Sequence, residues 1–236
     1  MSVDMSTGKS VGVVVPVLNE EKVIAANLDQ LLRDPAIAAV VVVDGGSTDA
    51  TLMEVHKQRR KHPDRLLQID SAPGRGRQMN AGAQHLQTDW LLFHHADSIL
   101  PSNAGSMLAG LPEAIVWGGF RHRFNPSNWK LAVVSALHNF RCRTSGVVYG
   151  DQSMFVRRSF FFELGGFAQA GLEDLDFSDR ALALKKSHLL PACVDTASRK
   201  FTQIGEFKAL AQVISIILRY ERQRKLGNDS FFKNYR

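Results

Sequence analysis

The first hundred residues alternate between strand-like and helix-like segments, and this alternation restricts the possible folds more than any other feature of the sequence. The pattern predicts four strands: residues 11–18, 38–44, 65–70 and 89–97. The first is an almost unbroken β-branched run and the second is also strongly apolar, which is typical of buried strands. Each of the first three leads into a helical pattern: residues 23–32, 51–55 and 72–86. Strands and helices that alternate at this spacing predict βαβ units, and therefore an α/β fold with a mostly parallel central sheet.

The second half of the chain is less regular. The pattern predicts a strand with a glycine bend at residues 115–124, a long helix at 128–143, and a loop with a short strand at 144–158. It then predicts a helix stopped by two glycines at 159–167, an amphipathic helix that opens with acids at 172–186, and a final helix at 206–225. No internal repeat or linker divides the chain. We therefore expect one domain over residues 1–236.

The composition is that of a globular protein, with 44% hydrophobic and 22% charged residues, which excludes mostly disordered, collagen-like and coiled-coil chains. No apolar run approaches the roughly 20 residues of a membrane-spanning helix, and the first ten residues lack the apolar core of a secretory signal. A cytoplasmic location is the expectation. Cys142 and Cys193 lie far apart, which favours free thiols over a disulfide or a metal site.

The net charge of +6 suits an anionic partner, such as a nucleic acid, an anionic lipid or a phosphorylated small molecule. The basic residues are scattered in pairs, and a solvated surface explains such pairs equally well. No nucleic-acid-binding motif accompanies the charge, so we expect no nucleic acid partner.

Polar residues gather where the predicted strands end, at Asn19-Glu20, at residues 44–47 and at residues 94–97. Parallel sheets bind ligands at the carboxyl ends of their strands, so these clusters mark a candidate site. The Asp44 carboxylate can accept hydrogen bonds from a base NH or a ribose hydroxyl. The alternative is an aspartate in a tight turn that caps the following helix.

Three further clusters could carry chemistry. The loop Gly74-Arg75-Gly76-Arg77 could bind phosphate, although it matches no P-loop or dinucleotide fingerprint and glycine with arginine also makes ordinary surface loops. In an extended chain the side chains of His95 and Asp97 point to the same side and could hold Mg²⁺ or Mn²⁺. Asp97 could instead cap a turn. The side chain of His94 points elsewhere and is expected in the core. Glu173, Asp174 and Asp176 are at the start of a predicted helix. The helix dipole alone would explain acids at this position. Alternatively, two adjacent carboxylates there could supply a general base.

The ordered motifs resemble those of family 2 glycosyltransferases with a GT-A fold. The matching segments are VVVPVLNEE, VVVDGGSTDAT, LLFHHADSILP, GDQSMFVRRSFFFELGGF and LEDLDFSDRAL, within about residues 10–200. In this order, the first segment is similar to the opening strand of that family and the second to its nucleotide-binding turn. The third is similar to the strand that ends in the metal-binding DXD motif, the fourth to the acceptor-side segment, and the fifth to the catalytic helix. VDGGSTDAT, GRGRQMNAGA, HADS and YGDQ also resemble a narrower subgroup, the selenodomain-associated glycosyltransferases, sometimes linked to arsenosugar biosynthesis.

The resemblance implies a Rossmann-like nucleotide-diphospho-sugar transferase fold and an inverting transfer of sugar from a nucleotide-diphosphate sugar to an unknown acceptor hydroxyl. It divides the domain into a nucleotide-binding half at about residues 10–100, an acceptor and catalytic half at about 101–205, and a C-terminal helix at about 206–225. The apolar stripe of that last helix packs on the domain or, with its basic end, contacts a membrane peripherally. The alternatives are a nucleotide-sugar-binding protein without turnover and a sugar nucleotidyltransferase.

The resemblance also implies roles for individual residues. Pro16, Asn19 and Glu20 would line the nucleotide end, Asp44 would meet the base or ribose, and Arg75 or Arg77 would approach the nucleotide. Asp97 would hold Mn²⁺ or Mg²⁺ against the diphosphate. His95 replaces the first acid of the DXD motif and would contact the metal, the ribose or neither. Asp174 would be the catalytic base, and Glu173 would position the acceptor or support Asp174.

Overall fold

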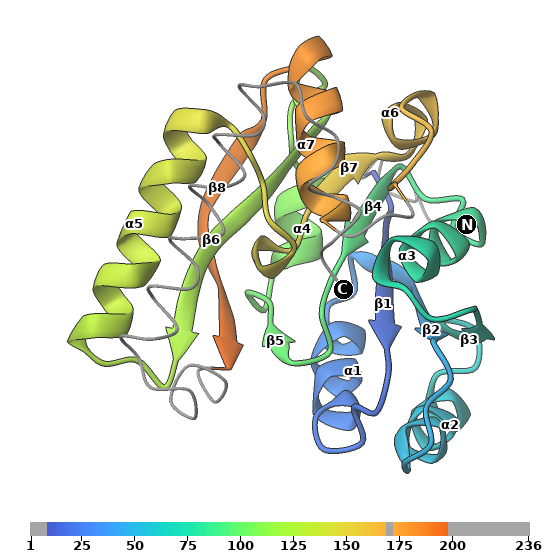
Figure 1. The fold of residues 1–236 in the computed structure, drawn as a ribbon. Helices are drawn as coiled ribbons and strands as arrows, with labels where there is room; N and C mark the ends of the chain where they lie inside the picture. Colours follow the sequence, from blue (N-terminus) through green and yellow to red (C-terminus); the bar gives the residue numbers. More distant parts are fainter. Residues whose placement is uncertain (1–8, 169–171, 198–236) are drawn as a thin grey trace, which may run out of the picture.

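The computed structural model describes residues 9–168 and 172–197. Its first half contains four parallel strands, with the helices between them (Figure 1). These elements are β1 (Val11–Val17), α1 (Ile24–Arg33), β2 (Ile37–Asp44), α2 (Thr51–Lys61), β3 (Leu66–Asp70), α3 (Arg75–Gln84) and β4 (Trp90–Phe93). The predicted βαβ alternation is confirmed.

The second half extends the same sheet. It contributes β5 (Ser98–Ile99), α4 (Ala104–Ala109), β6 (Trp117–Asn125), α5 (Trp129–Ser145), the short 3₁₀ helix η1 (Gly150–Gln152), β7 (Phe155–Arg157), α6 (Arg158–Glu163), α7 (Glu173–Leu184) and β8 (His188–Ala197). In the described part of the chain, the strand order is β3-β2-β1-β4-β7-β6-β8-β5. β7 runs antiparallel to β4 and β6, whereas β8 runs parallel to β6. The parallel pairings therefore outnumber the antiparallel ones.

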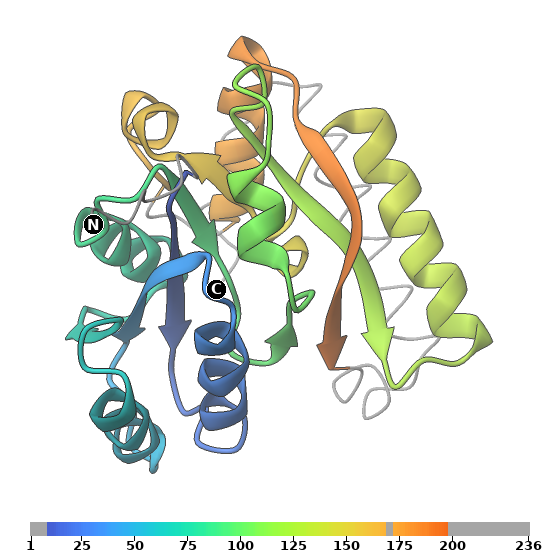
Figure 2. The same ribbon diagram turned by 180° about the vertical axis from the view of Figure 1, so that it is seen from behind.

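Helices cover both faces of the sheet. On one face, α1 and α4 pack in one apolar cluster with Val13, Val15 and Leu92 (Figure 2). On the other face, α3, α6 and α7 pack with Val14 and Phe93. All seven residues of β1 are buried. Burial on both faces explains why the strands carry unbroken apolar runs instead of alternating ones.

The structure corrects several local expectations. β4 ends at Phe93, not at residue 97, because the chain turns there and the Ser98 amide donates to the His95 carbonyl. α1 begins at Ile24, one residue after the predicted start. β5 and β8 were not predicted. The predicted helix at 206–225, with its packing or membrane contact, lies outside the described residues.

Two expectations about composition also have an outcome. Both cysteines are free thiols; Cys142 is buried and Cys193 is partly exposed. Within residues 9–168 and 172–197, none of the helices combines the length and the apolarity needed to cross a bilayer.

Candidate active site

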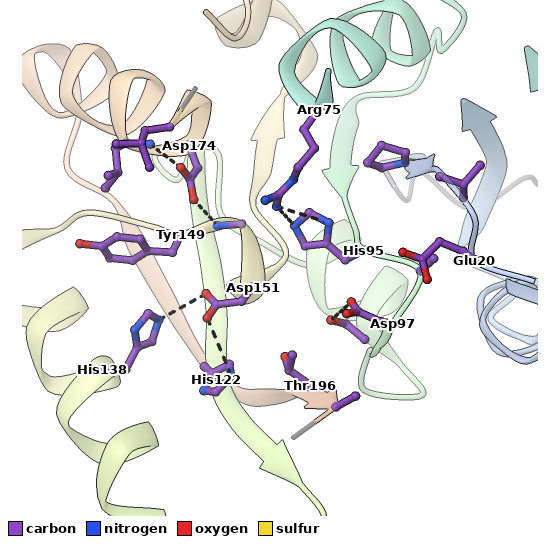
Figure 3. A pocket seen from close by; sticks show the side chains of 18 of the residues that line it. Glu20, Arg75, His95, Asp97, His122, His138, Tyr149, Asp151, Asp174 and Thr196 are labelled. Carbon is purple, nitrogen blue, oxygen red and sulfur yellow. Dashed lines mark hydrogen bonds and ion pairs between the residues drawn. The ribbon is translucent and has the colours of Figure 1, made fainter. Parts of the chain in front are cut away.

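A cavity of about 720 Å³ opens where the carboxyl ends of β1 and β4 face the second half of the chain (Figure 3). Pro16, Glu20 and Gln78 line it on the β1 side. Gln78 donates from its side-chain amide to the Val17 and Val43 carbonyls, both at 2.9 Å, and so closes the ends of β1 and β2. The opposite wall contains residues from β6, α5, η1, α7 and β8. One cavity thus joins segments that lie far apart in the sequence.

His95 and Asp97 both line this cavity from the turn after β4. They share the site because of the turn at residues 95–98 and not because of strand alternation. The Asp97 carboxylate accepts a long hydrogen bond of 3.5 Å from the Ser98 hydroxyl. Among the described residues, no group of three or more His, Cys, Asp and Glu side chains is arranged to hold a metal ion. Asp97 alone would therefore need further oxygen ligands from a bound molecule.

Arg75 connects the two sides of the cavity. It is the first residue of α3, and its Nη2 contacts the His95 Nε2. Its Nε lies 3.4 Å from the Glu173 Oε1. Glu173 does not line the cavity but is buried behind Arg75, and burial raises the pKa of its carboxyl group. Arg77, the other predicted arginine, is not among the lining residues.

Asp174 lines the cavity from the first turn of α7. Its Oδ2 accepts a hydrogen bond of 2.7 Å from the Gly150 amide, and its Oδ1 accepts one of 2.9 Å from the Leu175 amide. A Cβ at position 150 would lie 2.7 Å from the Arg75 Nη2 and 2.9 Å from the His95 Nε2, so a larger residue there would displace the ends of these two side chains. Asp176 instead pairs with Arg180 at 2.6 Å and does not line the cavity.

Asn19 and Asp44 organise the loop after β2 and do not line the cavity. The Asp44 carboxylate is buried and accepts hydrogen bonds of 3.0 Å from the Gly46 and Ser47 amides. The Asn19 side chain accepts one of 2.8 Å from the Thr48 amide, with Asn19 itself in a left-handed conformation at φ 58°. Asp44 therefore lies in a tight turn, but it does not cap α2, whose N-cap is Ala50.

The sequence reasoning missed a second polar cluster in the cavity wall: His122 on β6, His138 on α5 and Asp151 on η1 (Figure 3). The His138 Nε2 lies 3.4 Å from the Asp151 Oδ1, and the His122 Nε2 lies 3.9 Å from the Asp151 Oδ2. Burial lowers the pKa of His138, but the charge and hydrogen bond of Asp151 outweigh burial and raise it well above its ordinary value. The motif YGDQ was the only signal in the sequence that pointed here.

His94 lies in the core, as the sequence predicts. Its Nδ1 lies 2.8 Å from the Ser153 hydroxyl, and its Nε2 lies 2.9 Å from the Asn27 side-chain amide. Burial lowers the pKa of His94 from 6.5 to about 4. His94 is thus buried in its neutral form beside the turn that carries Asp97.

The buried His94 gives folding stability a pH dependence of known sign. Because the pKa of His94 is lower in the folded state, neutral His94 makes its full contribution to the free energy of unfolding above pH 6.5. This contribution is lost as the pH falls toward about 4. We expect a loss of about 3 kcal/mol over this window. Urea unfolding of the wild type and of His94→Gln at several pH values measures it. An equally steep loss in the variant would contradict the assignment to His94.

The sequence matches the model of a known protein family. A model of Glycosyl transferase family 2 matches residues 12–163. The chain belongs to this family. The matched family 2 segment starts in β1 and extends to the end of α6, so it contains Asp97, Arg75 and Asp151 but not Asp174. An uncharacterized glycosyltransferase, YaiP of Escherichia coli (strain K12), is 30% identical over 95 residues, which are 40% of this chain and 24% of that protein.

Solved structures share the GT-A-type fold of this family 2 chain. The mannosyltransferase PcManGT from Pyrobaculum calidifontis superposes with a TM-score of 0.67 at 20% identity, over 80% of this chain and 57% of that one. TarS 1–349 of S. aureus superposes with a TM-score of 0.64 at 19% identity, over 88% of this chain and 64% of that one. The predicted GT-A fold class is thus confirmed. The chain spans less than two thirds of the length of each of these relatives.

Proposed function

We propose that this chain transfers a sugar from a nucleotide-diphosphate sugar to an acceptor hydroxyl, with inversion at the anomeric carbon. One observation carries the proposal: a single cavity holds Asp97 on its β1–β4 side and Asp174 on its α7 side, with Arg75 between them. A carboxylate that can bring a cation to a diphosphate and a second one that can accept a proton are the two groups that such a transfer needs.

The donor nucleotide would lie at the carboxyl ends of β1 and β2. Pro16 and Glu20 line this end directly, and Asn19 and Asp44 would act through the loop that they hold, with Asp44 near the base or ribose. Arg75 would meet the diphosphate charge. Known relatives support a donor of this class, because PcManGT was solved with GDP-Man and Mn²⁺ and TarS 1–349 with UDP-GlcNAc. The narrower selenodomain-associated subgroup remains a prediction from the motifs.

The residues fit a divalent cation only together with the donor. Mg²⁺ and Mn²⁺ are often held by one or two carboxylates and substrate phosphates, and Asp97 supplies one such carboxylate in the cavity wall. The cation would neutralise charge on the leaving diphosphate. His95 contacts Arg75, so in our proposal it orients that arginine, and a direct metal contact by His95 is the alternative.

Asp174 would accept the proton of the acceptor hydroxyl as the oxygen attacks the anomeric carbon. The bond from that carbon to the diphosphate breaks on the opposite face, and its electron pair leaves with the diphosphate. The Gly150 and Leu175 amides fix the orientation of the Asp174 carboxylate. Glu173 would support the site by holding Arg75, which is a positioning role.

Ligand binding tests this proposal first. A ligand that binds only the folded protein raises its melting temperature. We expect UDP or GDP to raise it more with Mn²⁺ than without, and adenosine to raise it least. The matching nucleotide sugar should then release its nucleoside diphosphate slowly to water. Binding without any release or transfer would favour a nucleotide-sugar-binding protein, and no binding of any nucleoside diphosphate would refute the proposal.

A further inference from the structure

Arg141 on α5 lines the same cavity and lacks an anionic partner among the described residues. Its guanidinium group lies over the Tyr149 ring, 4.1 Å from the ring centroid. Its Nε and Nη1 are buried, and within the described part of the chain they make no hydrogen bond and no ion pair with a carboxylate. A buried guanidinium with unsatisfied N–H groups is costly, so a site of this kind favours a bound anion.

His138 adds a second donor next to Arg141. The His138 Nδ1 lies 3.5 Å from the Arg141 Nη2, and the His138 Nε2 faces Asp151. The raised pKa keeps His138 protonated at neutral pH. A protonated Nδ1 cannot accept a hydrogen bond from the arginine, so two N–H donors lie side by side. The Asp151 carboxylate neutralises the positive charge of His138, so the positive charge of Arg141 has no carboxylate partner among the described residues.

This pair belongs to the acceptor side of the cavity. His138, Tyr149 and Asp151 lie on the α5 and η1 wall, below Asp174, while Glu20 and Asp97 lie on the opposite side (Figure 3). The donor diphosphate, placed at Asp97 and Arg75, would therefore leave Arg141 and His138 without a ligand. The wall near the proposed base is where an acceptor must bind to present its hydroxyl.

We propose that Arg141 and His138 form an anion subsite, and that the acceptor is a hydroxyl compound carrying a phosphate or carboxylate group. The inference rests on the proposed function and names the substrate class of its acceptor site. The anionic group sits against Arg141, and the hydroxyl of the same molecule reaches Asp174. A free metabolite and a lipid headgroup present this chemistry equally well. The experiment has an arm for each.

The first arm uses glycerol 3-phosphate as the probe and glycerol as its neutral counterpart. Calorimetric titration is done on protein saturated with a nucleoside diphosphate and Mn²⁺, which fills the donor side. We expect glycerol 3-phosphate to bind at least about 10-fold more tightly than glycerol, because one charge-assisted hydrogen bond is worth that factor or more. The second arm measures flotation with phosphatidylcholine vesicles with and without phosphatidylglycerol.

Variants assign the preference to the subsite. Arg141→Gln should remove the preference for the anionic probe, and Arg141→Lys should restore part of it. Arg143→Gln is the matched control, because Arg143 is exposed on the same helix and its loss should leave the preference intact. Melting temperatures of the three variants, compared with that of the wild type, exclude unfolding as the cause.

The outcomes separate the subsite from the proposed function. Arg141-dependent preference in the first arm identifies a free anionic acceptor, and the same dependence in the vesicle arm alone identifies a lipid headgroup. Equal binding of anionic and neutral probes in both arms, or equal effects of Arg141→Gln and Arg143→Gln, overturns the subsite. If no nucleoside diphosphate binds, the proposed function fails, and the same comparison of variants on nucleotide-free protein still decides the subsite.

Discussion

Replacing Asp174 by asparagine should lower turnover by about 10²- to 10⁴-fold, the usual contribution of a general base. Asparagine keeps the shape of the side chain and one amide-accepting oxygen but cannot take the proton of the acceptor hydroxyl. The affinity for the donor should stay nearly unchanged, because the base acts on the acceptor. Initial rates of transfer measure the effect, and donor hydrolysis to free sugar replaces transfer until the acceptor is known.

Asp176→Asn is the matched control for Asp174. It removes a carboxylate two residues away in the same helical turn, where the side chain pairs with Arg180 and does not line the cavity. We expect it to retain most of the turnover. Asp174 also accepts two backbone hydrogen bonds, so the melting temperature of each variant must be measured. A correctly folded Asp174→Asn enzyme with full turnover would place the base outside α7.

Replacing Asp97 by asparagine should lower turnover by about 10²- to 10³-fold, because neutralisation of the leaving diphosphate is worth several kcal/mol. The same change should remove the increase in nucleoside diphosphate affinity that Mn²⁺ or Mg²⁺ produces. Titration of the nucleotide with metal and with EDTA measures this increase directly. It is a binding measurement and does not depend on knowing the acceptor.

Asp70→Asn is the matched control for Asp97. Asp70 also ends a strand of the parallel half, but it is exposed, accepts from the Gln68 side chain, and lies outside the cavity. Its loss should leave the metal effect unchanged. If EDTA and Asp97→Asn both leave nucleotide affinity as it was, the metal role is refuted. If the metal effect is present, His95→Asp tests whether position 95 faces the ion, because a second carboxylate there would strengthen metal binding.

Local sequence pattern was sufficient for the parallel half of the fold. β1, β2 and β3 are predicted to within a residue. β1 and most of β2 are buried and therefore apolar, and such runs are readable without knowing their partners. β3 is an edge strand and is mostly half-buried. The same pattern failed at β8. That strand contains Pro191 and lies mostly half-buried, with a register shift against β6 at Phe120 and Arg121, so its pairing with β6 was not readable from its own residues.

The candidate site divides in the same way. Glu20, Arg75, Asp97 and Asp174 line one cavity. The strand-end argument pointed to Glu20 and Asp97, since the carboxyl ends of parallel strands meet at one edge, whereas the family resemblance pointed to Arg75 and Asp174. Asp44, Arg77 and Glu173 carry similar motif signals but lie outside the cavity, since whether a side chain lines the cavity depends on the packing of neighbouring loops.

The sequence by itself determined the α/β class, the parallel core and the family motifs, because each is encoded in residues close together in the chain. Only the tertiary structure decided which charges meet. His122, His138 and Asp151 come from a strand, a helix and a 3₁₀ turn, and the packing of α5 and η1 on β6 brings them together. The same packing sets the Arg141 guanidinium over the Tyr149 ring and beside His138. Charges act through distance in space, and distance in space is set by the fold.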